Sequence, residues 1–118
     1  MRYEVEEIKD FLIIHAIGDL TLESHIKILD EAIAEHINDG YHKFLFNLEQ
    51  LENIDVDGIG IFINCLADVE VHGGGCYILI EDDHVFDNLT RTGLDKLIKV
   101  YRSKDEFADE HDLIIPED

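Results

Sequence analysis

Two carboxylates, Asp55 and Asp57, lie in a short segment between an apolar stretch and an amphipathic one. We call this segment, residues 53–60, the hinge; it reads Asn53-Ile-Asp-Val-Asp-Gly-Ile-Gly60. Aspartates at this spacing can bind a metal ion, can exchange protons as a catalytic pair, or can accept hydrogen bonds at the start of a helix and contact a partner. Each possibility predicts a different class of protein.

A calcium-binding loop matches the first half of the hinge only. Asn53, Asp55 and Asp57, followed by Gly58, fit the first, third, fifth and sixth positions of a calcium loop. The twelfth position is Asn64, whereas such loops need a bidentate glutamate there. A strand pattern also precedes the segment where a helix is required. A calcium site is therefore the weaker alternative, and we expect no metal ligands.

Signatures of catalysis are absent from the sequence. The seven histidines are scattered, and no nucleophile elbow, dinucleotide fingerprint or zinc-binding helix motif occurs. The two cysteines, Cys65 and Cys76, are too far apart for a Cys-x-x-Cys pair and are predicted to be buried free thiols. We expect a protein that is not an enzyme, with no catalytic residue and no cofactor.

The charge of the chain restricts its partners. Twenty-eight acidic residues against nine basic ones give a net charge of −19. Nucleic acids and anionic membranes attract cationic surfaces, so neither is an expected partner. A basic protein partner fits this charge, and so does a solvated acidic shell without a partner. No apolar run approaches the roughly 18 residues that span a membrane, and the charged N-terminus predicts no export, so we expect a cytoplasmic protein.

Hydrophobic periodicity predicts alternating strands and helices. The predicted strands are residues 2–8, 11–17, 43–48, 76–80 and 97–101. Helices are predicted after Thr21 or Ser24 as N-cap, over residues 59–71, from residue 81, and after Ser103 as N-cap. This order predicts an α/β protein with one domain, residues 1–118, in which about four helices pack on a mixed sheet of about five strands.

The hinge aspartates have structural interpretations as well. Asp57 is a candidate N-cap of the second helix, worth about 1 kcal/mol. Asp55 is a candidate acceptor for hydrogen bonds from backbone amides of the turn. Neither role excludes contact with a partner.

Several segments together resemble the STAS domain family, over nearly the whole chain. They are Gly18-Asp19-Leu20, the strand Phe44 to Leu48, the hinge, Leu89 to Asp95, and Val100-Tyr101 leading to Ser103-Lys104-Asp105-Glu106. In this family the hinge usually reads Asp-Ser-Ser-Gly-Leu-Gly. The resemblance implies the STAS fold and a role like that of the anti-sigma factor antagonists.

The resemblance also implies a partner and a switch. The family's antagonists bind an anti-sigma factor that is also a serine kinase, and phosphorylation of the second hinge serine weakens binding. That position is Asp57 here, so the acceptor hydroxyl is absent. Asp57 is expected to mimic the phosphorylated state in part or to make the protein independent of the kinase.

A partner-binding surface follows from the same resemblance, and its expected residues are Asp19, Asp55, Val56, Asp57, Gly58, Ile59 and Asn64. The alternative function is that of a STAS subunit in a larger sensory or transport assembly. The oligomeric state stays open.

Overall fold

A five-stranded mixed sheet forms the centre of the protein, whose computed structural model describes residues 2–114. The strand order is β1-β2-β3-β4-β5; β1 is antiparallel to β2, and the other neighbours are parallel. The strands are β1 (Arg2–Ile8), β2 (Phe11–Leu20), β3 (Lys43–Ile54), β4 (Gly75–Leu79) and β5 (Val100–Tyr101). The predicted α/β class and the mixed sheet are confirmed.

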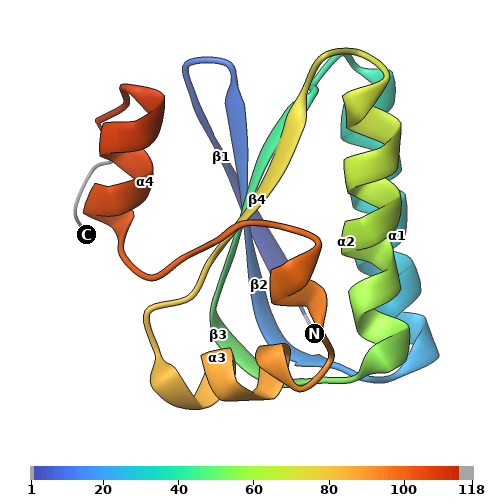
Figure 1. The fold of residues 1–118 in the computed structure, drawn as a ribbon. Helices are drawn as coiled ribbons and strands as arrows, with labels where there is room; N and C mark the ends of the chain where they lie inside the picture. Colours follow the sequence, from blue (N-terminus) through green and yellow to red (C-terminus); the bar gives the residue numbers. More distant parts are fainter. Residues whose placement is uncertain (1, 115–118) are drawn as a thin grey trace.

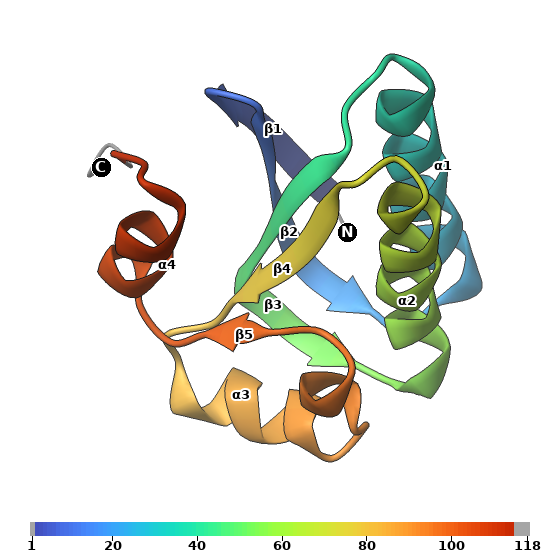
Figure 2. The ribbon, with the colours of Figure 1, turned by 45° about the horizontal axis from the view of Figure 1, so that its top comes forward.

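Four α-helices pack on this sheet, again as predicted. They are α1 (Glu23–Asn38), α2 (Val56–Glu70), α3 (Asp83–Thr90) and α4 (Lys104–His111), with a short 3₁₀ helix, η1 (Leu94–Lys96). Helices α1 and α2 lie side by side on one face of the sheet, and α4 lies on the other (Figures 1 and 2). Helix α3 runs across one end of the sheet, at the lower edge of Figure 1.

The larger core lies between the sheet and helices α1 and α2. Alternation along β3 directs Phe44, Phe46 and Leu48 to this side, because successive side chains of a strand point to opposite faces. From α1, Leu29 and Ile33 enter the same core. They belong to an apolar stripe along α1, formed by Ile26, Leu29, Ile33 and Ile37, whose spacing is that of one side of a helix. Both faces of the central strands are therefore covered where the helices pack.

A second, aromatic core holds α4 against the opposite face of the sheet. Phe107 of α4 is fully buried and packs edge-on against Phe11, with ring centroids 5.3 Å apart, and against Tyr101, at 5.1 Å. The Tyr101 hydroxyl lies 3.0 Å from Nε2 of His111, and burial lowers the pKa of this histidine. The sequence indicates an apolar tail over residues 113–116. Its Leu113 is buried here too, whereas residues 115 and 116 lie outside the described residues.

Helix caps were predicted with mixed success. Ser103 caps α4 as predicted, because its Oγ accepts a hydrogen bond of 3.1 Å from the backbone N–H of Glu106. The prediction for α1 was wrong: Leu22, not Thr21 or Ser24, occupies the N-cap position, and it makes no side-chain cap. Strand β2 stays paired with β3 as far as Leu20, so the chain can turn toward α1 only after this residue.

Several element boundaries also differ from the prediction. Strand β2 continues through Gly18 and Asp19, and β3 runs to Ile54 instead of ending at Leu48. Parallel pairing continues to the Leu20–Ile54 pair, so backbone hydrogen bonding outweighs the low strand propensity of glycine and aspartate. Strand β5 has only two residues, Val100 and Tyr101.

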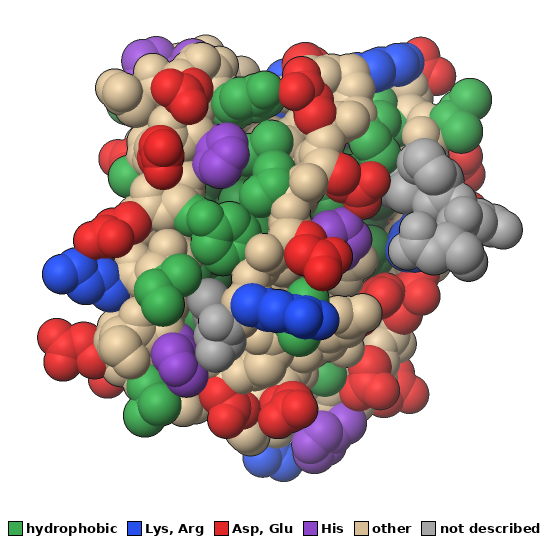
Figure 3. Space-filling model, turned by 180° about the vertical axis from the view of Figure 1, so that it is seen from behind, with side chains coloured by type: hydrophobic (Ala, Val, Ile, Leu, Met, Phe, Trp, Pro, Cys, Tyr) green, Lys and Arg blue, Asp and Glu red, His purple; other side chains and the backbone are tan. Residues whose placement is uncertain are grey.

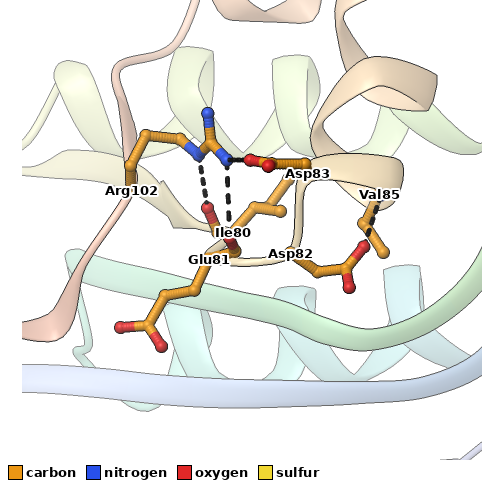
Figure 4. Close-up of polar contacts among 6 residues, drawn as sticks. All are labelled: Ile80, Glu81, Asp82, Asp83, Val85 and Arg102. Carbon is orange, nitrogen blue, oxygen red and sulfur yellow. Dashed lines mark hydrogen bonds and ion pairs between the residues drawn. The ribbon is translucent and has the colours of Figure 1, made fainter.

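Arg102 joins the short strand β5 to the start of α3 (Figure 4). Its Nε donates to the carbonyl oxygen of Ile80 at 2.9 Å, and its Nη2 forms an ion pair with Asp83 and a long hydrogen bond to the carbonyl of Glu81. The guanidinium also lies 4.0 Å from the ring centroid of Phe86. One side chain thus replaces the long backbone pairing that a two-residue strand cannot provide.

Acidic side chains are numerous on the surface of the molecule that Figure 3 shows. Figure 3 shows them scattered over the face seen from behind, with a group of apolar side chains near its centre.

One acid, Glu49 of β3, is partly desolvated, and burial together with the nearby charge of Glu81 raises its pKa. Lys104 and His15 offset this rise in part.

Replacement of Phe107 by alanine is expected to lower the free energy of unfolding by about 3–5 kcal/mol, because a buried ring is removed from a packed aromatic cluster. The substitution Asp109→Ala, on the exposed side of the same helix, should cost less than about 0.5 kcal/mol. Urea unfolding followed by circular dichroism measures both. Equal effects of the two substitutions would show that α4 is not anchored through Phe107.

The raised pKa of Glu49 predicts a pH dependence of stability. The folded state favours the protonated form of this carboxyl, so its stabilising effect is complete below the ordinary pKa of 4.5 and is lost as pH rises through the raised value. Glu49→Gln should remove this loss and make the protein more stable than the wild type at neutral pH. The test is to measure the free energy of unfolding of both proteins from pH 4.5 upward. Curves that run parallel as pH rises would contradict the prediction.

Candidate partner-binding site

The hinge lies where β2 and β3 end next to each other. Asp19 pairs with Asn53 in the sheet, and Leu20 pairs with Ile54, so both strands leave the sheet at the same level. The side chains also meet: Nδ2 of Asn53 donates to Oδ1 of Asp19 at 2.7 Å. The two connections that follow, β2 to α1 and β3 to α2, are therefore held together at the carboxyl end of the sheet.

Asp55 is the N-cap of α2. Its backbone is extended, and its Oδ1 accepts a hydrogen bond of 3.0 Å from the backbone N–H of Gly58. The helix consequently begins at Val56, three residues before the predicted start. The interpretation of Asp55 as an acceptor for turn amides is confirmed, whereas the interpretation of Asp57 as the N-cap was wrong, because that position belongs to Asp55.

Asp57 is the second residue of α2 and is exposed. Its carboxylate forms no hydrogen bond or ion pair with another described residue. The positive end of the helix dipole favours a carboxylate here, although no cap depends on it. Asp57 therefore presents a negative charge to solvent at the start of the helix.

Gly58 allows α2 to begin close to the end of β2. A Cβ at this position would lie 2.4 Å from the carbonyl oxygen of Leu20, a distance that real Cβ atoms do not adopt. The glycine is needed for this close approach of backbone to backbone. Gly60, two residues further along the helix, is under no such restriction, because a Cβ added there would have no neighbouring atom within 4 Å.

The structure divides the seven predicted contact residues into three groups. Asp57, Val56 and Asn64 are exposed; Val56 is 72% exposed, and Asn64 lies about two helical turns after Asp57. Ile59 is only 7% exposed and Gly58 is buried, so both lie inside the fold, and their contact with a partner stays a prediction. These two residues position the hinge.

Asp19 and Asp55 have defined hydrogen-bonding roles in addition to any contact with a partner. Asp19 accepts from Asn53, and Asp55 accepts from Gly58.

Two features near the hinge were not predicted from the sequence: the exposed position of Leu22 and the structural role of Asn53. Leu22 lies just after β2 and is 57% exposed, although it is a large apolar residue. A signal was available, since an apolar residue next to a helix start and outside the α1 stripe has no predicted place in the core. The role of Asn53 had no such signal, because it depends on the register between β2 and β3.

The calcium-binding alternative does not fit the geometry of the hinge. Helix α2 begins at Val56, so the residues from Asp57 onward follow a helical path and cannot wrap around an ion as a calcium loop does. Among residues 2–114, no group of three or more His, Cys, Asp and Glu side chains is placed to hold a metal ion.

Comparison with known families agrees with this architecture. The STAS domain family matches residues 2–107 of the sequence. The chain belongs to the STAS domain family.

Similarity to known relatives indicates which class of STAS domain protein the chain resembles. A protein of Thermotoga neapolitana, provisionally named an anti-sigma factor antagonist, is 28% identical over 103 residues, which cover 87% of this chain and 91% of the relative. The chain thus resembles an anti-sigma factor antagonist of the STAS type, and proteins of that class are regulatory.

Solved structures share the fold. The crystal structure of a Thermotoga maritima protein with a similar provisional name superposes with a TM-score of 0.77 at 21% identity, covering 92% of each chain. The anti-sigma factor antagonist SpoIIAA in its unphosphorylated form gives a TM-score of 0.76 at 16% identity, covering 97% of this chain and all of the other. At these identities the likeness concerns the fold alone.

No helix in the described part of the chain is long and apolar enough to cross a membrane.

The substitution Gly58→Ala is expected to destabilise the protein by about 1–3 kcal/mol, because the new methyl group overlaps the backbone of Leu20. The matched substitution Gly60→Ala should stabilise it by about 0.5–1 kcal/mol, since alanine is the better helix former and has space there. Thermal and urea unfolding distinguish the two. Equal effects would show that the approach of α2 to β2 does not depend on Gly58.

Proposed function

We propose that this protein is a regulator of the anti-sigma factor antagonist type, which binds a kinase-type anti-sigma factor through the hinge and the adjoining part of α2. Membership of the STAS domain family supports this function, as does the similarity to a relative named as such an antagonist. The proposed contact surface comprises the exposed residues Val56, Asp57 and Asn64 with the neighbouring Asp19 and Asp55.

The observation that carries the proposal is the free carboxylate of Asp57. Asp55 alone caps the helix, so the charge of Asp57 has no structural task that the fold requires. It occupies the hinge position at which the family's antagonists place the phosphorylated serine. A phosphoserine carries about −1.5 to −2 charges, whereas an aspartate carries one, so Asp57 supplies part of the charge of the phosphorylated form.

Two consequences follow for regulation. First, the hinge offers no hydroxyl group from residue 53 to residue 60, so a kinase has no acceptor there. Second, the fixed charge of Asp57 lowers the affinity for the anti-sigma factor permanently, as phosphorylation does transiently in the family. The protein then acts as an antagonist whose hinge does not respond to its partner's kinase activity.

Substitution Asp57→Ser tests this function directly. Loss of one unit of negative charge should strengthen binding to the anti-sigma factor by about tenfold, close to 1.4 kcal/mol. Isothermal titration calorimetry with the anti-sigma factor measures the change, and Asp57→Asn is the matched control that removes the charge without adding a hydroxyl. Both substitutions should strengthen binding equally.

Incubation with the partner kinase and ATP supplies a second readout. Only Asp57→Ser should gain a phosphate on the hinge, detected by mass spectrometry. Stoichiometric phosphate on a hinge residue of the wild type would contradict a kinase-independent hinge. An unchanged affinity of both variants would contradict a role for the charge of Asp57 in binding.

A further inference from the structure

The outward side of α2 carries an apolar stripe that nothing in the described structure covers. Four residues of α2 and its C-cap residue, Val71, share this side, and we call them the α2 outer stripe: Val56, Gly60, Ile63, Ala67 and Val71. At about 100° per residue they fall within an arc of about 80°. Val56 is 72% exposed, Ile63 36% and Val71 79%.

Helix α2 is therefore apolar on two opposite sides. Its inner side buries Ile59, Ile61, Phe62, Cys65 and Val69 in the core. A helix that packs on a sheet needs only this inner side to be apolar, and its solvent side is ordinarily polar. In this chain 31% of the residues are charged, yet the five stripe positions, which are neighbours on the helix surface, carry no charge. Such an apolar surface indicates a site that a binding partner covers. Figures 1 and 2 show no other element over this side of α2.

Both borders of the stripe are acidic. Asp57 and Asp68 lie on one border and Glu70 lies on the other, and all three are exposed. A second copy of this chain fits poorly, because two-fold antiparallel pairing of two α2 helices about Ile63 brings Asp57 of one copy near Asp68 of the other. Each copy also carries a net charge of −19. Charge complementarity thus selects a partner with basic residues on both sides of an apolar strip.

The shape of the stripe further restricts the partner. The 15 residues of α2 are about 22 Å long, and the stripe is one residue wide along this length. Its small members, Gly60 and Ala67, lie about two turns apart and allow close approach of another helix, because the interaxial distance depends on the side chains at the contact.

We infer that the α2 outer stripe docks a basic amphipathic helix of the protein partner, with that helix's apolar side on the stripe and its lysines or arginines against Asp68 and Glu70. The inference rests on the proposed function for the existence of a protein partner, and it extends the contact surface from the hinge to the far end of α2. It also assigns the chemistry of the contacting element.

Fluorescence anisotropy with a synthetic helical peptide tests the inference. The probe is a labelled peptide of about 15 residues, the length of α2, with leucines on one side flanked by lysines. The wild-type chain should bind it saturably. A serine in place of both Ile63 and Val71 should weaken binding about tenfold or more, since apolar contact is lost.

The matched control is Leu97→Ser, which removes a 61% exposed apolar side chain outside the stripe. Neither this variant nor the double-serine variant changes the net charge, so general attraction of a cationic peptide to an acidic protein is equal in both. Leu97→Ser should leave the affinity unchanged. Equal affinities of wild type, double-serine variant and control would overturn the inference.

Charge is tested separately. Asp68→Asn with Glu70→Gln should weaken binding of the lysine peptide and reduce its salt dependence, and a peptide with glutamates in place of the lysines should not bind. Equal binding of both peptides would overturn the basic character of the partner. Sedimentation velocity tests whether a second copy of the chain binds the stripe instead. A wild-type dimer that the double-serine variant abolishes would assign the stripe to a second copy and overturn the inference.

Failure of this inference differs from failure of the proposed function. Peptide binding that is insensitive to the stripe variants contradicts only the docking of a helix on α2. Binding of the intact anti-sigma factor that is insensitive to substitution of Asp57 contradicts the role proposed for the hinge.

Discussion

Parallel pairing of β2 with β3 up to the Leu20–Ile54 pair is the constraint on which the rest of the structure depends. It brings Asp19 beside Asn53, and their side-chain hydrogen bond holds the two connections that leave the sheet. It also places the carbonyl of Leu20 where only a glycine, Gly58, fits at the first turn of α2. The start of α2, and with it the position of Asp57, is thus fixed by backbone geometry.

Much of the fold could be predicted from local patterns, whereas the site could be predicted only in part. Alternating and helical periodicity identified the strands and helices, because burial of one face imposes those periods. Element ends were less accurate: Gly18 and Asn53 are poor strand residues that the neighbouring strand nevertheless keeps extended. Local propensity contains no information about that neighbour, and so β2 and β3 were predicted too short.

The same reasoning explains the errors at the hinge. Asp55 and Asp57 are chemically identical and two residues apart, so sequence alone could not decide which of them caps α2. The answer depends on backbone angles: Asp55 is extended, and Asp57 is already helical. Ile59 was expected to contact a partner from its place in the family's hinge, and the helix turns its side chain into the core.

The separation of capping from charge at the hinge has an evolutionary consequence. Because Asp55 caps the first turn of α2 by itself, the residue two positions later can change at a small folding cost, the lost interaction of its carboxylate with the helix dipole. A serine codon and an aspartate codon are then both acceptable to the fold, and natural selection on signalling alone decides between them. Under the proposed function, a lineage can convert a reversible signal into a permanent one, or restore it, without first acquiring a compensating mutation elsewhere in the domain.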